Sequence, residues 1–367
     1  MLFVLLSHFG FTFFPNQADR LPTVMRIIGM VASPSFVLIN GILIGFLCRI
    51  RSRDDYDRLR TIFIDRGLFL LTAGHLLLLG SHAPAYTLRF FSITDTIALC
   101  LLVSPFLATR LSVQNRIALG AVSYFASAVA IDVWHPHSEL SAILKESFVG
   151  TLNPIVYYYA FPFLPWFSVN CFGSALGEAL GEYQLRGDCG GMKRLLAVAG
   201  GAAMTASLAL NGSYLWLKHE GMPASLRNVF RELVSPLQKT PPGPGYLLWY
   251  GALGLGIILV CLALESRSSF TRPLRRAAQI GEASLFVFIL QFYVYLVLIL
   301  PFNTRLPMPR FWPVYLVASC AVVIAAAFEW QKRGCNRFLT VGYRGLRERA
   351  DAERALTGSP EFDAGRP

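Results

Sequence analysis

The chain has 367 residues, of which 54% are apolar, and its mean hydropathy of +0.50 lies well above that of a soluble domain. The formal net charge of +11 is explained by basic loops that face anionic lipid, and since no nucleic-acid-binding module is visible we expect no nucleic-acid partner. The seven cysteines show no CxxC or Cys/His metal spacing, so we expect no metal site.

Ten apolar stretches are candidates for membrane-spanning helices, each of which needs about 20 residues. The nine longer ones lie near 27–48, 61–80, 91–108, 116–133, 155–178, 195–216, 246–264, 278–302 and 311–329. The first, from Met1 to Phe14, reaches only about 21 Å at about 1.5 Å per residue, so we expect the first helix to begin upstream of Met1. The sequence therefore predicts an all-α, polytopic integral membrane protein with about ten transmembrane helices.

The distribution of Lys and Arg predicts the orientation of these helices. Alternate loops hold 21 basic residues on one side and 10 on the other, and the richer set comprises 49–60, 109–116, 179–194, 265–277 and the tail from Gln331 to Arg354. The positive-inside rule assigns the richer set and both termini to the cytoplasm. We thus expect one membrane domain over 1–330 and a charged cytoplasmic tail over 331–367 that ends in disorder.

Titratable residues gather on the other side of the membrane, to which the orientation assigns all six histidines. His8 lies near the outer end of the first helix, where it is a candidate general base, or a histidine bonded structurally at the interface. His75 and Asp95 lie near the outer ends of consecutive helices. A carboxylate at this depth needs a partner, and we expect His75 to be that partner, with Arg89 as the alternative.

Two further groups of residues are candidates for ligand contacts. Arg51 and Arg66 lie at the inner side and could form a basic mouth for a phosphate-bearing ligand, although charge that faces lipid explains the loop arginines equally well. Asn40 and Gln291 are amides in the middle of apolar helices. Each must find a partner in the bundle, either by joining helices or by contacting reactants.

Four segments, in order, resemble the transmembrane acyltransferases, in particular the branch of heparan-α-glucosaminide N-acetyltransferase and its bacterial relatives. The segments are MLFVLLSHFGF, SPSFVLINGILIGF, AFPFLPWFSVNCFGSALGE and IGEASLFVFILQFYVYLV. The third, with Pro165 and Trp166, is the most specific. Type-three acyltransferases and the succinyltransferases of periplasmic glucans have similar first helices. Two departures are Gln291, where the family often has His or Asn, and the absence of the Arg-Gly opening before the first-helix histidine.

The resemblance implies transfer of an acyl group, usually acetyl, from cytoplasmic acyl-coenzyme A to a hydroxyl or amine of an extracytoplasmic glycan or glycolipid. On this interpretation His8 is the catalytic base, helped by His75 and Asp95. Acyl-coenzyme A enters near Arg51 and Arg66, and its thioester lies near Asn40 and Gln291. We expect no metal cofactor. We expect the protein to lie in a bacterial cytoplasmic (inner) membrane, where it could form a homo-oligomer.

A second interpretation belongs to another class of protein. A proton-coupled transporter, or a flippase of lipid-linked sugars, would use His75 and Asp95 as a proton relay. Such carriers commonly consist of two related halves with broken helices, and the sequence shows no such symmetry. The acyltransferase is therefore the favoured prediction.

Overall fold

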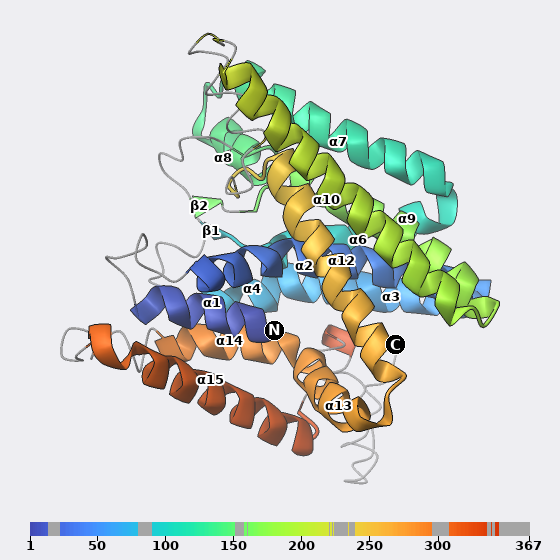
Figure 1. The fold of residues 1–367 in the computed structure, drawn as a ribbon, viewed down its shortest axis with the longest axis vertical. Helices are drawn as coiled ribbons and strands as arrows, with labels where there is room; N and C mark the ends of the chain where they lie inside the picture. Colours follow the sequence, from blue (N-terminus) through green and yellow to red (C-terminus); the bar gives the residue numbers. More distant parts are fainter. Residues whose placement is uncertain are drawn as a thin grey trace, which may run out of the picture.

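The computed structural model describes residues 1–13, 23–79, 90–150, 158–159, 161–219, 221, 223, 234, 239–295, 308–335, 339 and 342–344. These residues form a helical bundle (Figure 1). Its α-helices are α1 (Leu2–Phe13), α2 (Thr23–Ile50), α3 (Arg53–Phe69), α4 (His75–Leu79), α6 (Ile93–Arg110), α7 (Val113–Val133), α8 (Glu139–Phe148), α9 (Phe163–Leu185), α10 (Cys189–His219), α12 (Pro244–Glu265), α13 (Ser268–Glu282), α14 (Ser284–Tyr293) and α15 (Met308–Lys332). A π-helical turn, η2 (Leu70–Gly74), joins α3 to α4, and two short strands, β1 (Phe90–Phe91) and β2 (Tyr158–Tyr159), pair in parallel.

Seven helical segments of the described chain are long and apolar enough to cross a membrane. They are Ile27–Ile50, Arg53–Leu78, Ile93–Arg110, Val113–Val133, Cys189–Trp216, Pro244–Glu265 and Pro313–Lys332. Each coincides with a predicted segment, which confirms the integral membrane, all-helical class. The total of ten spanning helices and the cytoplasmic location of both termini stay predictions.

Two predicted spans have a different form in the structure. The segment expected near 155–178 forms α9, which begins at Phe163 and continues to Leu185. The segment expected near 278–302 is divided at Ala283, where α13 ends and the short apolar helix α14 begins. Residues 296–302 of that prediction lie outside the described residues. The divided segment gives α14 its own direction, and this helix contributes to the site described below.

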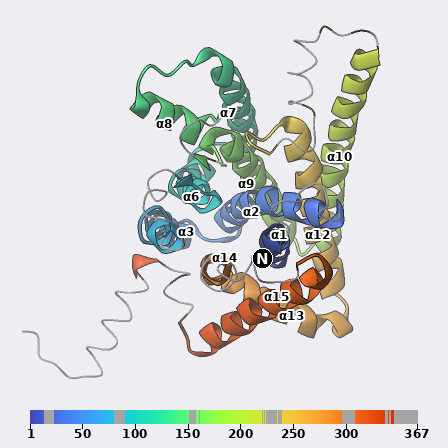
Figure 2. The ribbon, with the colours of Figure 1, turned by 90° about the vertical axis from the view of Figure 1, so that its left-hand side faces the viewer.

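Helices α2 and α9 form the centre of the bundle, with α1, α6 and α12 against α2 and α7 against α9 (Figures 1 and 2). Glycines allow their close approach. A Cβ added to Gly41 or Gly45 of α2 would collide with the carbonyls of Asn170 and Ser174, and one added to Gly177 of α9 would collide with the carbonyl of Ile42. Such small residues let two membrane helices bring their backbones into contact. This contact fixes the frame on which the site residues are placed.

The bundle has two chemically different ends. The end reached by the C-termini of α2, α6 and α9 carries the Lys- and Arg-rich connections, and we call it the basic end. At the opposite end, Phe90 pairs with Tyr158 and Phe91 with Tyr159, which holds the entry to α6 next to the entry to α9. The predicted histidine side corresponds to this opposite end, which we call the histidine end.

Part of the predicted tail is packed against the membrane helices. Tyr343 donates to or accepts from the hydroxyl of Thr72 at 2.6 Å, and its ring lies 5.4 Å from that of Phe69. The backbone N–H of Arg344 donates to Asp65 Oδ2 at 2.9 Å. Most of the charged segment predicted from Tyr343 onward lies outside the described residues. The cytoplasmic tail over 331–367 therefore stays a prediction, and its residues Tyr343 and Arg344 contact α3 and the turn after it.

Candidate active site

His75 and Asp95 form a pair at the histidine end. His75 Nδ1 lies 2.8 Å from Asp95 Oδ1, and Asp95 is 1% exposed. The second carboxylate oxygen accepts hydrogen bonds from the backbone N–H of Ser92 at 2.7 Å and from its hydroxyl at 2.8 Å. This capping box at the start of α6 immobilises Asp95, which then fixes the orientation of the imidazole. The predicted pair is therefore present; Arg89, the alternative partner, lies outside the described residues.

The π-helical turn η2 determines where His75 points. The backbone N–H of His75 bonds to the carbonyl of Leu70, five residues earlier, instead of four as in an α-helix. The π turn contains one residue more than an α-helical turn. The residues after it therefore point about 100° away from the directions they would have if the same chain formed a continuous α-helix. The hydrogen bond to Asp95 also makes Nδ1 the protonated nitrogen, which leaves Nε2 as the basic atom of the neutral ring.

His8 lies on α1 against one face of α14. Its ring centroid is 5.2 Å from that of Phe292 and 6.1 Å from that of Phe288. The same face carries Gln291, which is 0% exposed. The Gln291 side chain is close enough to interact with the imidazole, yet neither of its polar atoms completes a well-formed hydrogen bond to a described residue. A buried amide in this state costs free energy, which makes Gln291 a candidate contact for a ligand.

Asn40 is the other predicted amide, and it lies on α2. Its Nδ2 is buried and has no acceptor among the described residues. Ile44, one helical turn further on the same face, belongs to a cluster with Leu285 and Ile289 of α14. The Asn40 face of α2 thus shares a hydrophobic cluster with α14, but no direct contact between the two amides is among the described ones.

Helix α14 separates the two histidines. It carries the residues that touch His8, and its Tyr293 hydroxyl donates to the carbonyl of Leu77, just after His75, at 2.8 Å. The described contacts do not bring His8 and the His75–Asp95 pair together directly. The structure thus contains two adjacent groups, His8 with Gln291 and His75 with Asp95, connected through one short helix.

A lysine missed by the sequence analysis lies close to His8. Lys239, in the connection before α12, is near enough for its charge to act on the imidazole. Its Nζ lies 5.2 Å from the centroid of the Phe161 ring, which in turn is 5.5 Å from the ring of Trp166. Its position follows only from the fold, in which the connection packs against α7 and the Pro242 carbonyl accepts a hydrogen bond from the Tyr124 hydroxyl.

The structure separates the two arginines predicted for the phosphate-bearing ligand. Arg51 lies at the basic end, exposed directly after α2, whereas Arg66 lies about 20 Å along α3 from its start at Arg53, at about 1.5 Å per residue, and is half-buried next to the docked Gly342. Arg49 and Arg60 are bound to acids, with Glu182 at 3.3 Å and Asp57 at 2.9 Å. Arg51 makes no ion pair with a described residue. An open cavity of about 540 Å³ near this end is lined by Arg272, Arg276 and the start of α1 at Leu2.

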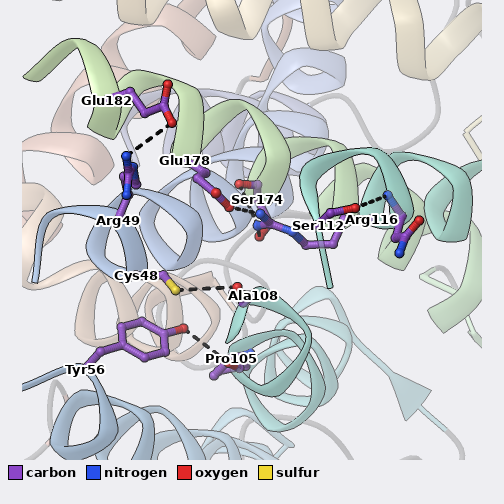
Figure 3. Close-up of polar contacts among 11 residues, drawn as sticks. Cys48, Arg49, Tyr56, Pro105, Ala108, Ser112, Arg116, Ser174, Glu178 and Glu182 are labelled. Carbon is purple, nitrogen blue, oxygen red and sulfur yellow. Dashed lines mark hydrogen bonds and ion pairs between the residues drawn. The ribbon is translucent and has the colours of Figure 1, made fainter. Parts of the chain in front are cut away.

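The half of the bundle nearer the basic end also contains a polar cluster around Arg116, a residue that the sequence analysis placed in the loop 109–116 (Figure 3). Arg116 is 1% exposed; its Nη1 donates to the Ser174 hydroxyl at 2.6 Å and to the Ser174 carbonyl at 3.1 Å, and its Nη2 pairs with Glu178. Beside this cluster, the Tyr56 hydroxyl donates to the Pro105 carbonyl at 3.4 Å. The Arg116 contacts join α7 to α9, and the Tyr56 contact joins α3 to α6. The Nε atom of Arg116 is buried without a hydrogen-bond partner among the described residues.

The fold and its buried polar groups define a polytopic membrane protein with a histidine and amide site toward one end and basic residues at the other. Among the described residues, no three His, Cys, Asp or Glu side chains gather as metal ligands. Residues 1–209, more than half of the chain, match the family described as heparan-alpha-glucosaminide N-acetyltransferase, catalytic. The chain belongs to this family of membrane N-acetyltransferases, which confirms the suspected resemblance. The comparisons with curated proteins and with solved structures gave no significant match.

Proposed function

We propose that the protein transfers an acyl group, in the first place acetyl, from acyl-coenzyme A on the cytoplasmic side to a hydroxyl or amine of an extracytoplasmic glycan. The observation that carries this proposal is the buried, incompletely bonded Gln291 amide beside His8, in a chain that belongs to an acetyltransferase family. The basic end would face the cytoplasm of a bacterial inner membrane.

His8 is the proposed general base. The acceptor oxygen or nitrogen attacks the thioester carbonyl carbon, a C–O or C–N bond forms, and the C–S bond breaks. The proton lost by the acceptor goes to His8 and from there to the departing thiolate, so the reaction needs no oxidant or reductant. The Gln291 N–H₂ group is placed to donate to the thioester oxygen as negative charge develops on it. His75, oriented by Asp95, is the proposed second proton-transfer group.

The donor would approach from the basic end. Its phosphates would bind Arg51 and Arg66, and the arginines of the cavity next to Leu2 supply further positive charge. From Leu2 to His8 the rise along α1 is about 9 Å, at about 1.5 Å per residue. Asn40 lies in α2, which extends between the two ends, and Gln291 lies in the short helix α14; both amides suit contacts with the arm that carries the thioester.

The decisive experiment measures acetyl-coenzyme A binding and acetyl transfer by the purified protein in detergent. His8→Ala should lower transfer by about 10²- to 10⁴-fold, the usual contribution of a general base, while donor binding changes little. His219→Ala, at the exposed end of α10, is the matched control and should leave both unchanged. Acetyl transfer by His8→Ala at the wild-type rate would exclude His8 as the base.

The donor site is tested separately. Arg51→Gln should weaken acetyl-coenzyme A binding about tenfold, as expected for loss of one charge-assisted contact, and Arg66→Gln should act in the same direction. Arg49→Gln is the matched control, since Arg49 already pairs with Glu182. If the protein binds no acetyl-coenzyme A at all, the proposed function is wrong.

The His75–Asp95 pair also keeps a second candidate function open. A paired imidazole and carboxylate at one end of a membrane bundle suits a proton relay in a coupled carrier of lipid-linked sugars. Proteoliposomes with a pH-sensitive dye inside distinguish the two functions. Sugar-dependent proton uptake without acyl transfer would favour the carrier, and transfer without proton flux would favour the acyltransferase.

A further inference from the structure

The described part of the C-terminal segment packs on one face of α3 and of the turn that follows it. Asp65, Phe69 and Thr72 share this face, because they are spaced four and three residues apart along the helix. The backbone N–H of Arg344 donates to Asp65 Oδ2 at 2.9 Å, and the ring of Tyr343 meets the ring of Phe69 edge to face. The segment therefore follows α3 to Phe69, the last residue before η2.

A glycine and a buried leucine fix the position of this segment. Gly342 has a φ of +89°, a conformation that favours glycine, and an added Cβ would lie 2.9 Å from Asp65 Oδ2 and 3.2 Å from Phe69 Cβ. Leu339 is 5% exposed and belongs to the hydrophobic cluster that contains Phe69. These contacts on both sides of the chain direction determine where the Tyr343 hydroxyl lies.

The hydroxyl hydrogens determine the direction of the hydrogen bonds at Thr72. The Thr72 hydroxyl donates to the carbonyl of Leu68 at 2.6 Å and thereby uses its single hydrogen. The Tyr343 hydroxyl, whose oxygen lies 2.6 Å from Thr72 Oγ1, is therefore the donor of the other bond. The two bonds form a chain from Tyr343 through Thr72 to the backbone of α3, in which each bond polarises the next.

Thr72 is the central residue of the π-helical turn that determines where His75 points. Such turns are rare and occur mostly at functional sites. On the far side of His75, the carbonyl of Leu77 accepts a hydrogen bond from the Tyr293 hydroxyl of α14 at 2.8 Å. Two tyrosine hydroxyls thus hold the chain around His75, Tyr343 before it and Tyr293 after it.

We propose that Tyr343 is a positioning residue for His75. By donating to Thr72 it holds the π-helical turn that directs the imidazole at Asp95. This inference rests on the proposed acyltransferase function, in which His75 is the second proton-transfer group. No described contact joins Tyr343 to His75, so Tyr343 acts through the backbone of the turn.

The first test measures kcat for acetyl transfer and KM for acetyl-coenzyme A with the purified full-length protein in detergent. Tyr343→Phe keeps the ring against Phe69 and removes only the hydroxyl. It should lower kcat about three- to tenfold, as expected for loss of one hydrogen bond, while KM for the donor and the unfolding temperature stay at the wild-type values. Thr72→Val should lower kcat by a similar factor, and Thr72→Ser, which keeps the hydroxyl, should retain the wild-type kcat.

A double variant and a control assign the effect to this hydrogen bond. Tyr343→Phe should cause no further loss when it is added to Thr72→Val, because both changes remove the same bond. Tyr183→Phe, which removes a tyrosine hydroxyl near the C-terminus of α9 at the basic end, should leave kcat unchanged. A wild-type kcat in Tyr343→Phe, or equal losses in Thr72→Ser and Thr72→Val, overturns the proposal.

Hydrogen–deuterium exchange tests the same contact without an acyl donor. The backbone amides of residues 70–79 should exchange about threefold faster or more in Tyr343→Phe and Thr72→Val than in the wild type, because the turn opens more often without the bond. Their exchange should not change in Tyr183→Phe. Unchanged exchange in Tyr343→Phe overturns the proposal. If the wild type transfers no acetyl group but exchange responds as expected, the proposed function fails while the positioning of His75 by Tyr343 stands.

Discussion

Arg116 of α7 and Glu178 of α9 form an ion pair in which the Arg116 side chain is almost completely buried. The guanidinium group also bonds to the hydroxyl and carbonyl of Ser174, so the pair connects α7 to the helix at the centre of the bundle. Arg49 and Glu182 form a second pair close by on α2 and α9, but both of its side chains are more than 40% exposed (Figure 3). The two pairs therefore allow a direct comparison of buried and exposed charge.

Arg116→Gln should destabilise the protein by about 3 kcal/mol, because Glu178 would keep a charge without its partner. Arg49→Gln should cost less than about 1 kcal/mol, since water replaces the lost contact. Thermal unfolding in detergent measures both. The double variant Arg116→Gln/Glu178→Gln should lose less unfolding free energy than the two single variants lose together. Strict additivity of the losses would show that the two residues do not interact.

The His75–Asp95 pair predicts an effect on activity that is separate from stability. In Asp95→Asn the amide oxygen can still accept a hydrogen bond from Ser92, which keeps the cap of α6. The amide N–H₂ group then faces the His75 ring, and because it is a donor it no longer holds the proton on Nδ1. Acetyl transfer should fall by about tenfold or more, with a change in unfolding free energy below about 1 kcal/mol.

Ser112→Ala is the matched control for Asp95→Asn. It removes the side-chain cap of α7, where Ser112 Oγ accepts the N–H of Asn115 at 3.2 Å. The variant should lose about 1 kcal/mol of stability and no activity. Equal activity losses in the two variants would show that Asp95 acts only through helix stability.

The contact between α2 and α9 predicts that single methyl groups are poorly tolerated there. Gly41→Ala should destabilise the protein by about 1–3 kcal/mol, because the new Cβ would overlap the carbonyl of Asn170 and force the helices apart. Gly201→Ala on α10 has nothing within 4 Å and should be neutral or slightly stabilising. Thermal unfolding of both variants is the measurement; similar values would mean that α2 and α9 can separate freely.

The sequence predicted the membrane class and seven of the spans, because long apolar runs follow from bilayer thickness alone. It also predicted the His75–Asp95 pair, because a carboxylate near a helix end in the membrane needs a partner and the two helices are consecutive. It could not predict that Lys239 would be inserted next to His8, because this depends on how the connection before α12 packs against α7 and α9. The burial of Arg116 was missed for a related reason: a basic residue near a helix end at the inner side usually faces water or lipid.

The π-helical turn between Leu70 and Gly74 also makes the length of this segment part of the site. If the same residues formed a continuous α-helix, with better backbone hydrogen bonding, His75 would point about 100° away from Asp95. By this reasoning, the chain keeps a locally less favourable backbone in exchange for the direction of one imidazole ring.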